Sequence, residues 1–568
     1  MRRKKKWREH PEQPDAIREI SLRHKLPHLI ARILLNRGLT AHEDILAFLE
    51  PSLEKLRPPF GLPDLEKAAA RLGDAVRRGE TVIVYGDYDV DGLTSTCLLH
   101  DFFQELGLPC LTYIPDRLQE GYGLKVPALQ GLAAQARLLV TVDCGVSDVA
   151  EVVWANAQGL EVIVTDHHEL PSVLPPALAV VNPKRGGEDY PFADLAGVGV
   201  ALLLALGVRA NLRESGWFKQ RPEPNMRSYL DFVALGTAAD VAPMQGENRI
   251  LVRQGLKVLG ESRRPGLVAL KEIAGLEGKP ISYRDAVFRL APRLNAAGRL
   301  GQARGALELL LSRDLAQARI QARYLNDLNR QRQGLEETVW RQALDYLEKR
   351  NLGARRVWVL AGEGWHPGVL GIVAARLAEE YHRPVALVSL EAGRGRGSAR
   401  SVEGFHLFRG LQACEEILLR FGGHQAAAGF EVAAEALDAL QEKLEEVFEQ
   451  QVGAEPLKPT LQVDAQVLLE DLDALFYQHL ERLRPFGPGN PEPVLACAGV
   501  ECLTSRIVGE RHLKVQLAQN GCLMEAIAFD MAGAHPLAGN LEVAFSPRFS
   551  YFQGRLHPEL RLLDWART

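Results

Sequence analysis

Short apolar runs alternate with longer amphipathic segments over residues 60–245. The runs are rich in β-branched residues, which favours buried strands, and the segments between them, such as 94–106 and 126–136, have helical spacing. Strands that alternate with helices predict βαβ units on a parallel sheet, so we expect an α/β fold. The predicted strands are 82–85, 111–114, 138–142, 161–165 and 178–181.

The pattern changes three times outside this region. Residues 15–56 predict short amphipathic helices that form a helical cap. The stretch 306–350 contains one glycine and no proline, so we expect a long helix that joins two lobes. A second α/β segment with two Gly-rich loops follows from Val357. Beyond the linker at 453–459 the periodicity is that of strands, and Asn520-Gly521 predicts a hairpin, so a small OB-type barrel is expected at the C-terminus.

Composition limits the class of protein. The 568 residues exceed what one core usually serves and suggest about three or four domains. A net charge of −5 argues against a protein coated with nucleic acid, so a polyanion would bind in a local basic groove. The basic residues at 1–8 are interpreted as a solvated tail. The seven cysteines show no metal-finger spacing. No apolar run reaches about 18 residues, so we expect a cytoplasmic protein with no membrane partner.

Acidic and histidine side chains follow three of the predicted strands. Asp87, Asp89 and Asp91 come after the first strand, Asp143 follows the third, and the triplet 166–168 follows the fourth. Because the carboxyl ends of parallel strands form the ligand site of such sheets, these side chains should converge. Crowded carboxylates repel one another unless a cation lies among them. The sequence therefore predicts a metal site.

Two other interpretations of the first acidic turn are open. The spacing of Asp87, Asp89 and Asp91 also fits the first half of an EF-hand, but the twelfth position is Leu98 instead of a bidentate glutamate, which excludes a calcium loop of that kind. Alternatively, Asp91 or Thr94 could cap a helix that begins near residue 94. Mixed carboxylate and imidazole ligands favour Mn²⁺ or Mg²⁺, and two such ions about 3.5–4 Å apart suit phosphodiester hydrolysis.

The motifs resemble those of a known superfamily. The triplet Asp166-His167-His168 resembles the one that names the DHH phosphoesterases. Segments 86–94, 292–299, 364–368 and 421–429 resemble, more narrowly, those of its RecJ family of single-strand exonucleases. The resemblance covers nearly the whole chain. It implies a DHH domain and a DHHA1 domain joined by a long helix and followed by an OB-type barrel.

The resemblance also implies roles for individual residues. Asp91, Asp143, His167 and Asp240 would bind one divalent ion, and Asp87, Asp89 and again Asp143 the other. His168 would contact the scissile phosphate, and Asp166 would orient a neighbouring histidine. Only one of the adjacent histidines is expected to bind metal, because neighbouring side chains of an extended segment point in opposite directions. The residues expected at the nucleic acid are Arg117, Arg293, Asn295 and Arg299, with Ser398, Arg400, Gly423 and His424 at its 5′ end.

The expected function is a 5′ to 3′ single-stranded-DNA-specific exonuclease that releases 5′-mononucleotides in DNA recombination and repair, with Mn²⁺ or Mg²⁺ as cofactor. A hydrolase of short oligonucleotides or cyclic dinucleotides, and a non-catalytic replication scaffold, are the alternatives. By resemblance alone, single-strand-binding protein and a helicase would be partners of a monomeric enzyme.

Barrel aromatics near Arg548, such as Phe545 and Phe549, either stack bases or form core. The expected parts are a basic tail and helical cap (1–59), the DHH domain (60–245), the helical region (246–350), the DHHA1 domain (351–452) and the OB-type domain (453–568).

Overall fold

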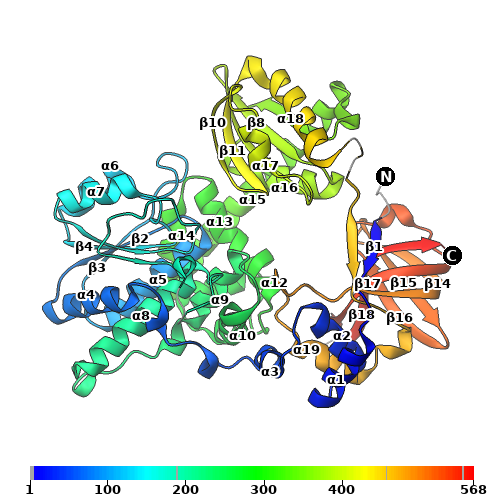
Figure 1. The fold of residues 1–568 in the computed structure, drawn as a ribbon, viewed down its shortest axis with the longest axis horizontal. Helices are drawn as coiled ribbons and strands as arrows, with labels where there is room; N and C mark the ends of the chain where they lie inside the picture. The colour runs from blue at the N-terminus through cyan, green and yellow to red at the C-terminus, as the bar shows by residue number, and fades with distance from the viewer. Residues whose placement is uncertain (1–4, 187–189, 454, 456, 553–554, 568) are drawn as a thin grey trace.

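The structure is a computed structural model that describes residues 5–186, 190–453, 455, 457–552 and 555–567. Figure 1 shows a first lobe built on a parallel sheet, a helical region beside it, a second lobe above, and a C-terminal barrel on the opposite side. The architecture is the mixed α/β fold with a terminal barrel that the sequence predicts.

The first lobe contains a five-stranded parallel sheet in the order β3-β2-β4-β5-β6. Each strand lies within two residues of its predicted position. The order reverses between β2 and β4, which makes this the switch point of the sheet. The strands are β2 (Val82–Gly86), β3 (Cys110–Tyr113), β4 (Leu138–Val142), β5 (Glu161–Thr165) and β6 (Ala179–Val181).

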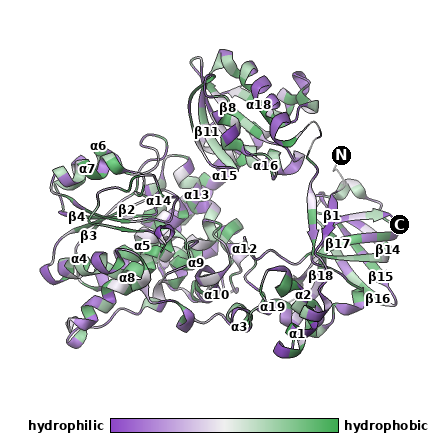
Figure 2. Ribbon diagram, in the orientation of Figure 1, coloured by the Kyte–Doolittle hydropathy of each residue, from purple (hydrophilic) through white to green (hydrophobic). Residues whose placement is uncertain are grey.

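Both faces of this sheet are buried. Val84 and Val140 point into one core, while Ile83 and Leu139 point into the other. Figure 2 accordingly colours β2 and β4 mostly as hydrophobic. The first core also holds α4 (Leu65–Arg78), α5 (Val90–Glu105) and α8 (Gly197–Glu214), and the second holds α6 (Val126–Ala133) and α7 (Val149–Ala157). Burial on both faces explains why the strands are continuous apolar runs.

The helical region ends in one long helix, but this helix is shorter than expected. Helix α15 (Leu315–Lys349) begins nine residues after the predicted start at 306, because Asp314 caps it by accepting a hydrogen bond from the Gln317 N–H at 2.7 Å. A separate helix, α14 (Ala303–Leu311), precedes it. Helix α9 (Leu230–Ala239) precedes this region, whose other helices are α10 (Gly246–Glu261), α11 (Pro265–Ile273), α12 (Tyr283–Asp285), the π-helical turn η6 (Ala286–Leu290) and α13 (Ala291–Arg299).

The second lobe is a mixed sheet in the order β10-β11-β9-β8-β7. The Gly/Arg-rich stretch expected to be a loop is strand β9 (Arg394–Arg400), which pairs with β8 and β11. Its glycines make room for neighbours, since a Cβ at Gly397 would lie 2.3 Å from the Phe430 ring. The remaining elements are β7 (Trp358–Glu363), α16 (Pro367–Tyr381), β8 (Val385–Glu391), α17 (Leu407–Gln412), β10 (Leu418–Gly423), β11 (Ala427–Ala433) and α18 (Leu437–Val452).

The C-terminal barrel closes through pairing of β14 with both β15 and β17. The predicted hairpin is confirmed: Asn520 and Gly521 have φ values of 50° and 82°, which a type I′ turn requires, and join β15 to β16. The elements are β12 (Thr460–Val463), β13 (Ala465–Gln466), α19 (Ala474–Arg482), β14 (Leu495–Val508), β15 (His512–Gln519), β16 (Cys522–Ala528), β17 (Gly539–Phe552) and β18 (Arg555–Arg567).

The N-terminal helices belong to the barrel's core. Ile30 and Phe48 share one hydrophobic cluster with Leu480 and Phe545. Part of the expected solvated tail is ordered, because β1 (Lys6–Glu9) pairs in parallel with β12; Met1–Lys4 lie outside the described residues. The helices are α1 (Pro14–His24), α2 (His28–Asn36) and α3 (His42–Leu49).

Arg249 of α10 links the helical region to the N-terminal helices and to the segment that precedes the barrel strands. Its buried guanidinium donates hydrogen bonds to the carbonyls of Phe48, Arg482 and Pro485. Burial, followed by the charge of Arg253, lowers its pKa to about 9. Among the described residues no helix combines the length and apolar composition needed to cross a lipid bilayer.

Candidate metal centre

The acidic and histidine segments meet at the carboxyl ends of β2, β4 and β5, at the switch point of the parallel sheet. Asp87 and Asp91 follow β2, Asp143 follows β4, and His167 follows β5; Asp240 joins them from the end of α9. Three groups of these residues have potential ligand atoms within 4.8 Å of one another. They are Asp87–Asp89–Asp143, Asp91–His167–Asp240 and Asp143–His167–His168.

The first acidic turn is held by its own side chains. Asp89 is the N-cap of α5 and accepts hydrogen bonds from the N–H groups of Asp91 and Gly92 at 2.9 and 3.1 Å. The expectation that Asp91 or Thr94 caps this helix is therefore wrong, because the helix begins four residues earlier than predicted, at Val90. One carboxylate thus serves the cap while it remains part of the acidic cluster.

Asp91 is fixed by the start of a second helix. Its two carboxylate oxygens accept hydrogen bonds from the N–H groups of Gly197 and Val198, at 2.7 and 2.9 Å, in the first turn of α8. A helix N-terminus favours a negative charge. Position 197 requires glycine, because a Cβ there would lie 2.8 Å from Oδ1 of Asp143. Nothing in the sequence pattern around Gly197 indicated this role.

The backbone is strained at one candidate ligand and at the residue after another. Asp143 has a φ of 61°, and Val241, which follows Asp240, has a φ of 61°. Left-handed backbone is unfavourable for a β-branched residue and costs roughly 1–3 kcal/mol where it occurs. Such strain concentrates at functional sites. Here it turns the chain directly after β4 and α9, at the edge where the carboxylates meet.

The adjacent histidines have different main partners. His167 Nε2 lies 3.0 Å from Asp143 Oδ1, and its Nδ1 lies 3.9 Å from Asp240 Oδ2. His168 Nδ1 instead pairs with Asp166 Oδ1 at 2.7 Å and with the Tyr122 hydroxyl at 3.0 Å. His168 Nδ1 also lies 3.9 Å from Asp143 Oδ1, and the two ring centres are 4.6 Å apart, so both rings lie on the same side of the cluster. The expectation that these neighbouring side chains point in opposite directions is therefore wrong, because the segment after β5 is not an extended strand.

Burial and mutual repulsion raise the pKa values of the carboxyl groups. The pKa of Asp91 rises to about 7 and that of Asp240 to about 8, through burial and then neighbouring carboxylates. Burial and the same repulsion place the pKa values of Asp87 and Asp143 well above their ordinary range. Among the described residues, Oδ1 of Asp87, Oδ1 of Asp143 and Nε2 of His167 are buried without a hydrogen-bond partner. Buried acceptors of this kind fit a divalent cation.

The pKa values of the two histidines are shifted in opposite directions. Burial, and then the charge of His168, lowers the pKa of His167 to about 4, so the ring is neutral and free to act as a ligand at neutral pH. Burial alone would lower the pKa of His168, but the hydrogen bond and charge of Asp166 outweigh it and raise the pKa to about 9. His168 is therefore a cation beside the cluster.

Some of the residues expected at the nucleic acid lie beside the metal cluster, and one does not. Asn295 accepts a hydrogen bond from the Val90 N–H at 3.2 Å, and Arg117 lies 5.0 Å from the Tyr88 ring centre. Arg299 donates to the Gly368 carbonyl of the second lobe at 3.3 Å. Arg293 instead contacts Asn326 and the carbonyl of Arg289, within the helical region.

Four guanidinium groups gather between the two lobes. Burial lowers the pKa of Arg299 to about 10, and the charges of Arg117, Arg332 and Arg400 contribute. Arg400 donates to Ser398 Oγ at 3.3 Å, and both side chains lie against Gly371 of α16. Cations that lower one another's pKa favour a bound anion. Arg332, from α15, was not identified from the sequence.

The turn between β10 and β11 carries Gly423 and His424. Gly423 has a φ of 145°, and the His424 N–H donates to the Ala427 carbonyl at 2.8 Å. The pKa of Glu169, which follows β5, is lowered chiefly by Lys184 and in part by the charge of His424.

Where the structure describes them, the barrel aromatics form part of the barrel core and do not offer a surface on which bases could stack. Phe545 is fully buried, and Phe549 packs on Tyr477 with ring centres 5.0 Å apart. The Arg548 guanidinium donates two hydrogen bonds to the Glu559 carboxylate. The side chains of Tyr551, Phe552 and Arg555 lie outside the described part of the chain.

Tyr122 is a site residue that the sequence analysis missed. Its hydroxyl donates to the Asp143 carbonyl at 3.2 Å and contacts His168. Its neighbours Gly121 and Gly123 have φ values of 80° and 82°. A tyrosine between two such glycines was the available signal, because the turn presents an aromatic ring from an exposed loop.

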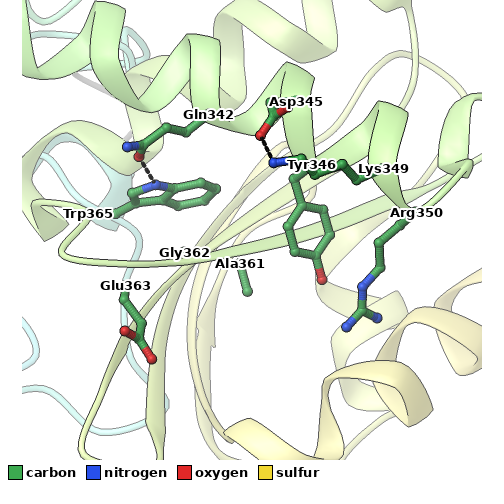
Figure 3. A pocket seen from close by; sticks show the side chains of 9 residues that line it. All are labelled: Gln342, Asp345, Tyr346, Lys349, Arg350, Ala361, Gly362, Glu363 and Trp365. Atoms are coloured by element: carbon green, nitrogen blue, oxygen red, sulfur yellow. Dashed lines mark hydrogen bonds and ion pairs between the residues drawn. The ribbon is translucent and has the colours of Figure 1, made fainter.

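A cavity of about 400 Å³ lies between α15 and the end of β7. Figure 3 shows Trp365 bonded to Gln342, the Asp345–Lys349 ion pair, and Arg350 beside Tyr346. None of its lining residues belongs to the metal cluster or the guanidinium group described above.

Comparisons with known proteins point to the same family in each part of the chain. Residues 81–237 match the DHH family N-terminal domain, 354–450 the DHHA1 domain and 463–564 the RecJ OB domain. The chain is 33% identical to the single-stranded-DNA-specific exonuclease RecJ of Bacillus subtilis over 99% of its own length and 71% of the relative's. It is 37% identical to the Escherichia coli protein of the same name, over 89% of the chain and 90% of the relative. The crystal structure of RecJ from Thermus thermophilus in complex with Mn²⁺ superposes with a TM-score of 0.84 at 33% identity, covering 99% of this chain and 80% of that one.

Proposed function

The chain belongs to the RecJ family of single-stranded-DNA-specific exonucleases, and from this premise we propose that it degrades single-stranded DNA from the 5′ end and releases 5′-mononucleotides. The observation that carries the proposal is the convergence of seven side chains with potential ligand atoms at the switch point, beside four guanidinium groups. DNA recombination and repair is the corresponding cellular role.

Two Mn²⁺ or Mg²⁺ ions fit the cluster. Asp91, Asp143, His167 and Asp240 would hold one, and Asp87 and Asp89 would hold the other together with Asp143, which belongs to two of the three ligand groups. Related RecJ structures were solved in complex with Mn²⁺ and with Mg²⁺. When bound, such ions lower the pKa of water and stabilise charge on the oxygens of an in-line displacement.

The chain's own residues orient the phosphate. His168 is held by Asp166 and Tyr122 and is positively charged at neutral pH, so it donates a hydrogen bond to an oxygen of the scissile phosphodiester. Asp166 is fully buried and fixes the orientation of the ring as well as its charge. Burial alone would raise the pKa of Asp166, but the hydrogen bond and charge of His168 outweigh it and lower the pKa below the ordinary range, so the carboxylate stays ionised.

The second lobe sets the direction in which the strand is degraded. Ser398 and Arg400 lie on one strand, close to Gly371 of α16, and Arg299 and Arg117 extend the positive charge toward Asp87. We infer that a terminal 5′-phosphate binds there, with Gly423 and His424 at its edge, while the adjacent phosphodiester reaches the metals. Phosphate recognition by arginine and backbone N–H groups supports this assignment.

The remaining expectations form part of the same proposal. The five-part division at 59, 245, 350 and 452 is our proposed domain scheme, the cytoplasm is the proposed compartment, and single-strand-binding protein and a helicase are the proposed partners of a monomer. The barrel favours long strands over dinucleotides as substrates, because its fold is of the type that binds oligonucleotides. The intact acidic cluster argues against a non-catalytic scaffold.

A time course on long DNA tests the function. Single-stranded DNA labelled at its 3′ end should shorten progressively with Mn²⁺, with mononucleotides as products, while EDTA stops the reaction and a blunt duplex survives. A labelled strand that persists, while dinucleotides are hydrolysed, would contradict the proposed substrate.

A further inference from the structure

Asp91, one of the candidate metal ligands, takes its orientation from the start of α8. Its two carboxylate oxygens accept hydrogen bonds from the N–H groups of Gly197 and Val198 at 2.7 and 2.9 Å. The oxygen that is bonded to Gly197, Oδ2, also lies 3.9 Å from His167 Nε2. A shift of the first turn of α8 would therefore move this carboxylate relative to the other two ligands of its group, His167 and Asp240.

The start of α8 has no side-chain cap of its own. Its N-cap residue is Ala196, whose methyl group cannot accept a hydrogen bond from the first turn. Asn248, the third residue of α10, instead fixes the backbone just before the helix. The Asn248 Oδ1 accepts a hydrogen bond from the Ala196 N–H at 3.4 Å, and its Nδ2 donates one to the Asp194 carbonyl at 2.6 Å. One amide thus bridges two backbone groups directly before the residues that bind Asp91.

The bridge depends on burial and on the chemistry of an amide. Asn248 and Ala196 are both fully buried, so solvent does not replace the bond between them. The bridge needs one atom that accepts and one that donates, and the asparagine amide offers both on a short stem. Loss of the amide would leave the buried Ala196 N–H without this acceptor, so the segment would shift to find another.

The turn of α10 that carries Asn248 is anchored on both sides. Toward the segment that precedes α8, the Glu247 carboxylate accepts a hydrogen bond from the Tyr190 hydroxyl, and both side chains are buried. On the other side, Arg249 donates hydrogen bonds to three backbone carbonyls of the N-terminal helices and of the segment before the barrel strands. A side chain can position another group only where its own place is fixed. The anchored turn meets this condition for Asn248.

We propose that Asn248 is a positioning residue of the metal centre, which holds the backbone before α8 so that the first N–H groups of this helix keep Asp91 oriented toward its partner ligands. The inference rests on the two-ion centre of the proposed function and adds to it a residue that contacts neither the ions nor the substrate. Groups that orient metal ligands typically account for about 10- to 100-fold of metal affinity or activity.

Calorimetric titration of the metal-free protein with Mn²⁺ tests the proposal without substrate. Asn248→Leu, which removes the amide at similar volume, should weaken the binding of one ion about 10- to 100-fold. The second ion should keep its affinity, because Asp91 is not among the ligands of the group Asp87–Asp89–Asp143. Asn248→Ala should give the same pattern, which excludes crowding by leucine as the cause and provides a second variant if leucine prevents folding.

The metal dependence of hydrolysis provides a second readout. Asn248→Leu should need about 10- to 100-fold more Mn²⁺ for its half-maximal rate, and its kcat should return to the wild-type value at saturating Mn²⁺. A kcat that stays low at every Mn²⁺ concentration would contradict a role that acts through metal binding.

Asn490→Leu is the matched control. Asn490 is also a fully buried asparagine, and it donates hydrogen bonds to the carbonyls of Leu483 and Pro485, both at 2.8 Å, in the segment before the barrel strands. Its loss should lower the thermal midpoint but leave both Mn²⁺ affinities unchanged. Wild-type Mn²⁺ affinities in both Asn248 variants would overturn the proposal, and so would an equal loss of affinity in Asn490→Leu, since the effect would then follow from general instability.

The outcome for Asn248 is separable from the outcome for the proposed function. A wild type that binds two Mn²⁺ ions but degrades no single-stranded DNA would contradict the proposed substrate alone, because the role of Asn248 is measured by metal binding. A wild type that binds no Mn²⁺ would overturn this inference together with the metal centre.

Discussion

His167 Nε2 lies 3.0 Å from Asp143 Oδ1, and among the described residues neither atom has a hydrogen-bond partner. The ring comes from the end of β5 and the carboxylate from the end of β4. Two buried polar atoms that lie this close without a hydrogen bond are unfavourable. A divalent cation between them removes the penalty, and this pair is therefore the core of the proposed metal centre.

We predict that Asp143→Asn reduces hydrolysis more than about a hundredfold, because the carboxylate is shared between two ligand groups. Binding of a single strand should remain, since the guanidinium groups are untouched. Turnover with Mn²⁺ and binding in EDTA measure the two effects. Asp74→Asn, at a surface ion pair, is the control. Turnover like that of the wild type would remove Asp143 from the centre.

Arg400→Ala should weaken the preference for 5′-phosphorylated over 5′-hydroxyl strands by roughly tenfold, because a charge-assisted bond to phosphate is lost. The ratio of kcat/KM for the two substrates is the measurement. Arg396→Ala, on the same strand but exposed, should keep the wild-type ratio. If both variants keep it, the 5′-phosphate binds elsewhere.

Asp166→Asn should move the alkaline limit of activity to lower pH by about one unit or more. The hydrogen bond and charge of Asp166 hold the pKa of His168 near 9, and an amide supplies no charge. The histidine then loses its proton at lower pH, so phosphate binding fails earlier as the pH rises. A kcat/KM profile from pH 6 to about 10 measures the shift. An unchanged alkaline limb would show that His168 need not be charged.

Tyr122→Phe should lower kcat about tenfold with little change in KM, because the hydroxyl positions His168 and the Asp143 carbonyl without being required for strand binding. Its pH profile should change as well, since one partner of His168 Nδ1 is lost. Steady-state kinetics across pH measure both. Tyr324→Phe, on an exposed face of α15, is the matched control. A pure KM effect would instead make Tyr122 a substrate contact.

Without metal, the protein should lose stability as the pH rises from 6 to 8. The folded pKa values of Asp91 and Asp240 lie near 7 and 8, above the ordinary 3.8, so between these limits the folded state binds protons that the unfolded state has released. The free energy of unfolding therefore falls with pH in this window. Mn²⁺ should raise the thermal midpoint more at pH 8 than at pH 6, and Asp240→Asn should flatten the dependence. A metal-free midpoint that rises with pH would contradict these assignments.

The strands and their acidic ends could be predicted because both are local properties. Burial on both faces gives β2, β4 and β5 continuous apolar sequences, and a parallel sheet places the residues after them at one edge. The sequence could not predict that Asp89 caps α5, because Asp87, Asp89 and Asp91 are all residues that suit an N-cap. The start of α15 depended on Asp314, in a segment with no glycine or proline to mark a break.

Long-range packing accounts for the other differences. Gly395 and Gly397 suggested a loop, but they sit in a strand because Val388 and Phe430 occupy the space of their missing side chains. Helices α1 to α3 pack on a barrel more than 400 residues later in the chain, which local periodicity does not report. The roles of Tyr122 and Gly197 likewise depend on contacts across the fold.

Titration of the metal-free protein with Mn²⁺, with bound ions counted by calorimetry, tests the central claim most directly. We predict two ions per chain for the wild type, and the loss of both high-affinity sites in Asp143→Asn, because in the proposed centre this one carboxylate binds both ions. Two ions bound with unchanged affinity by Asp143→Asn would contradict a metal centre organised around Asp143.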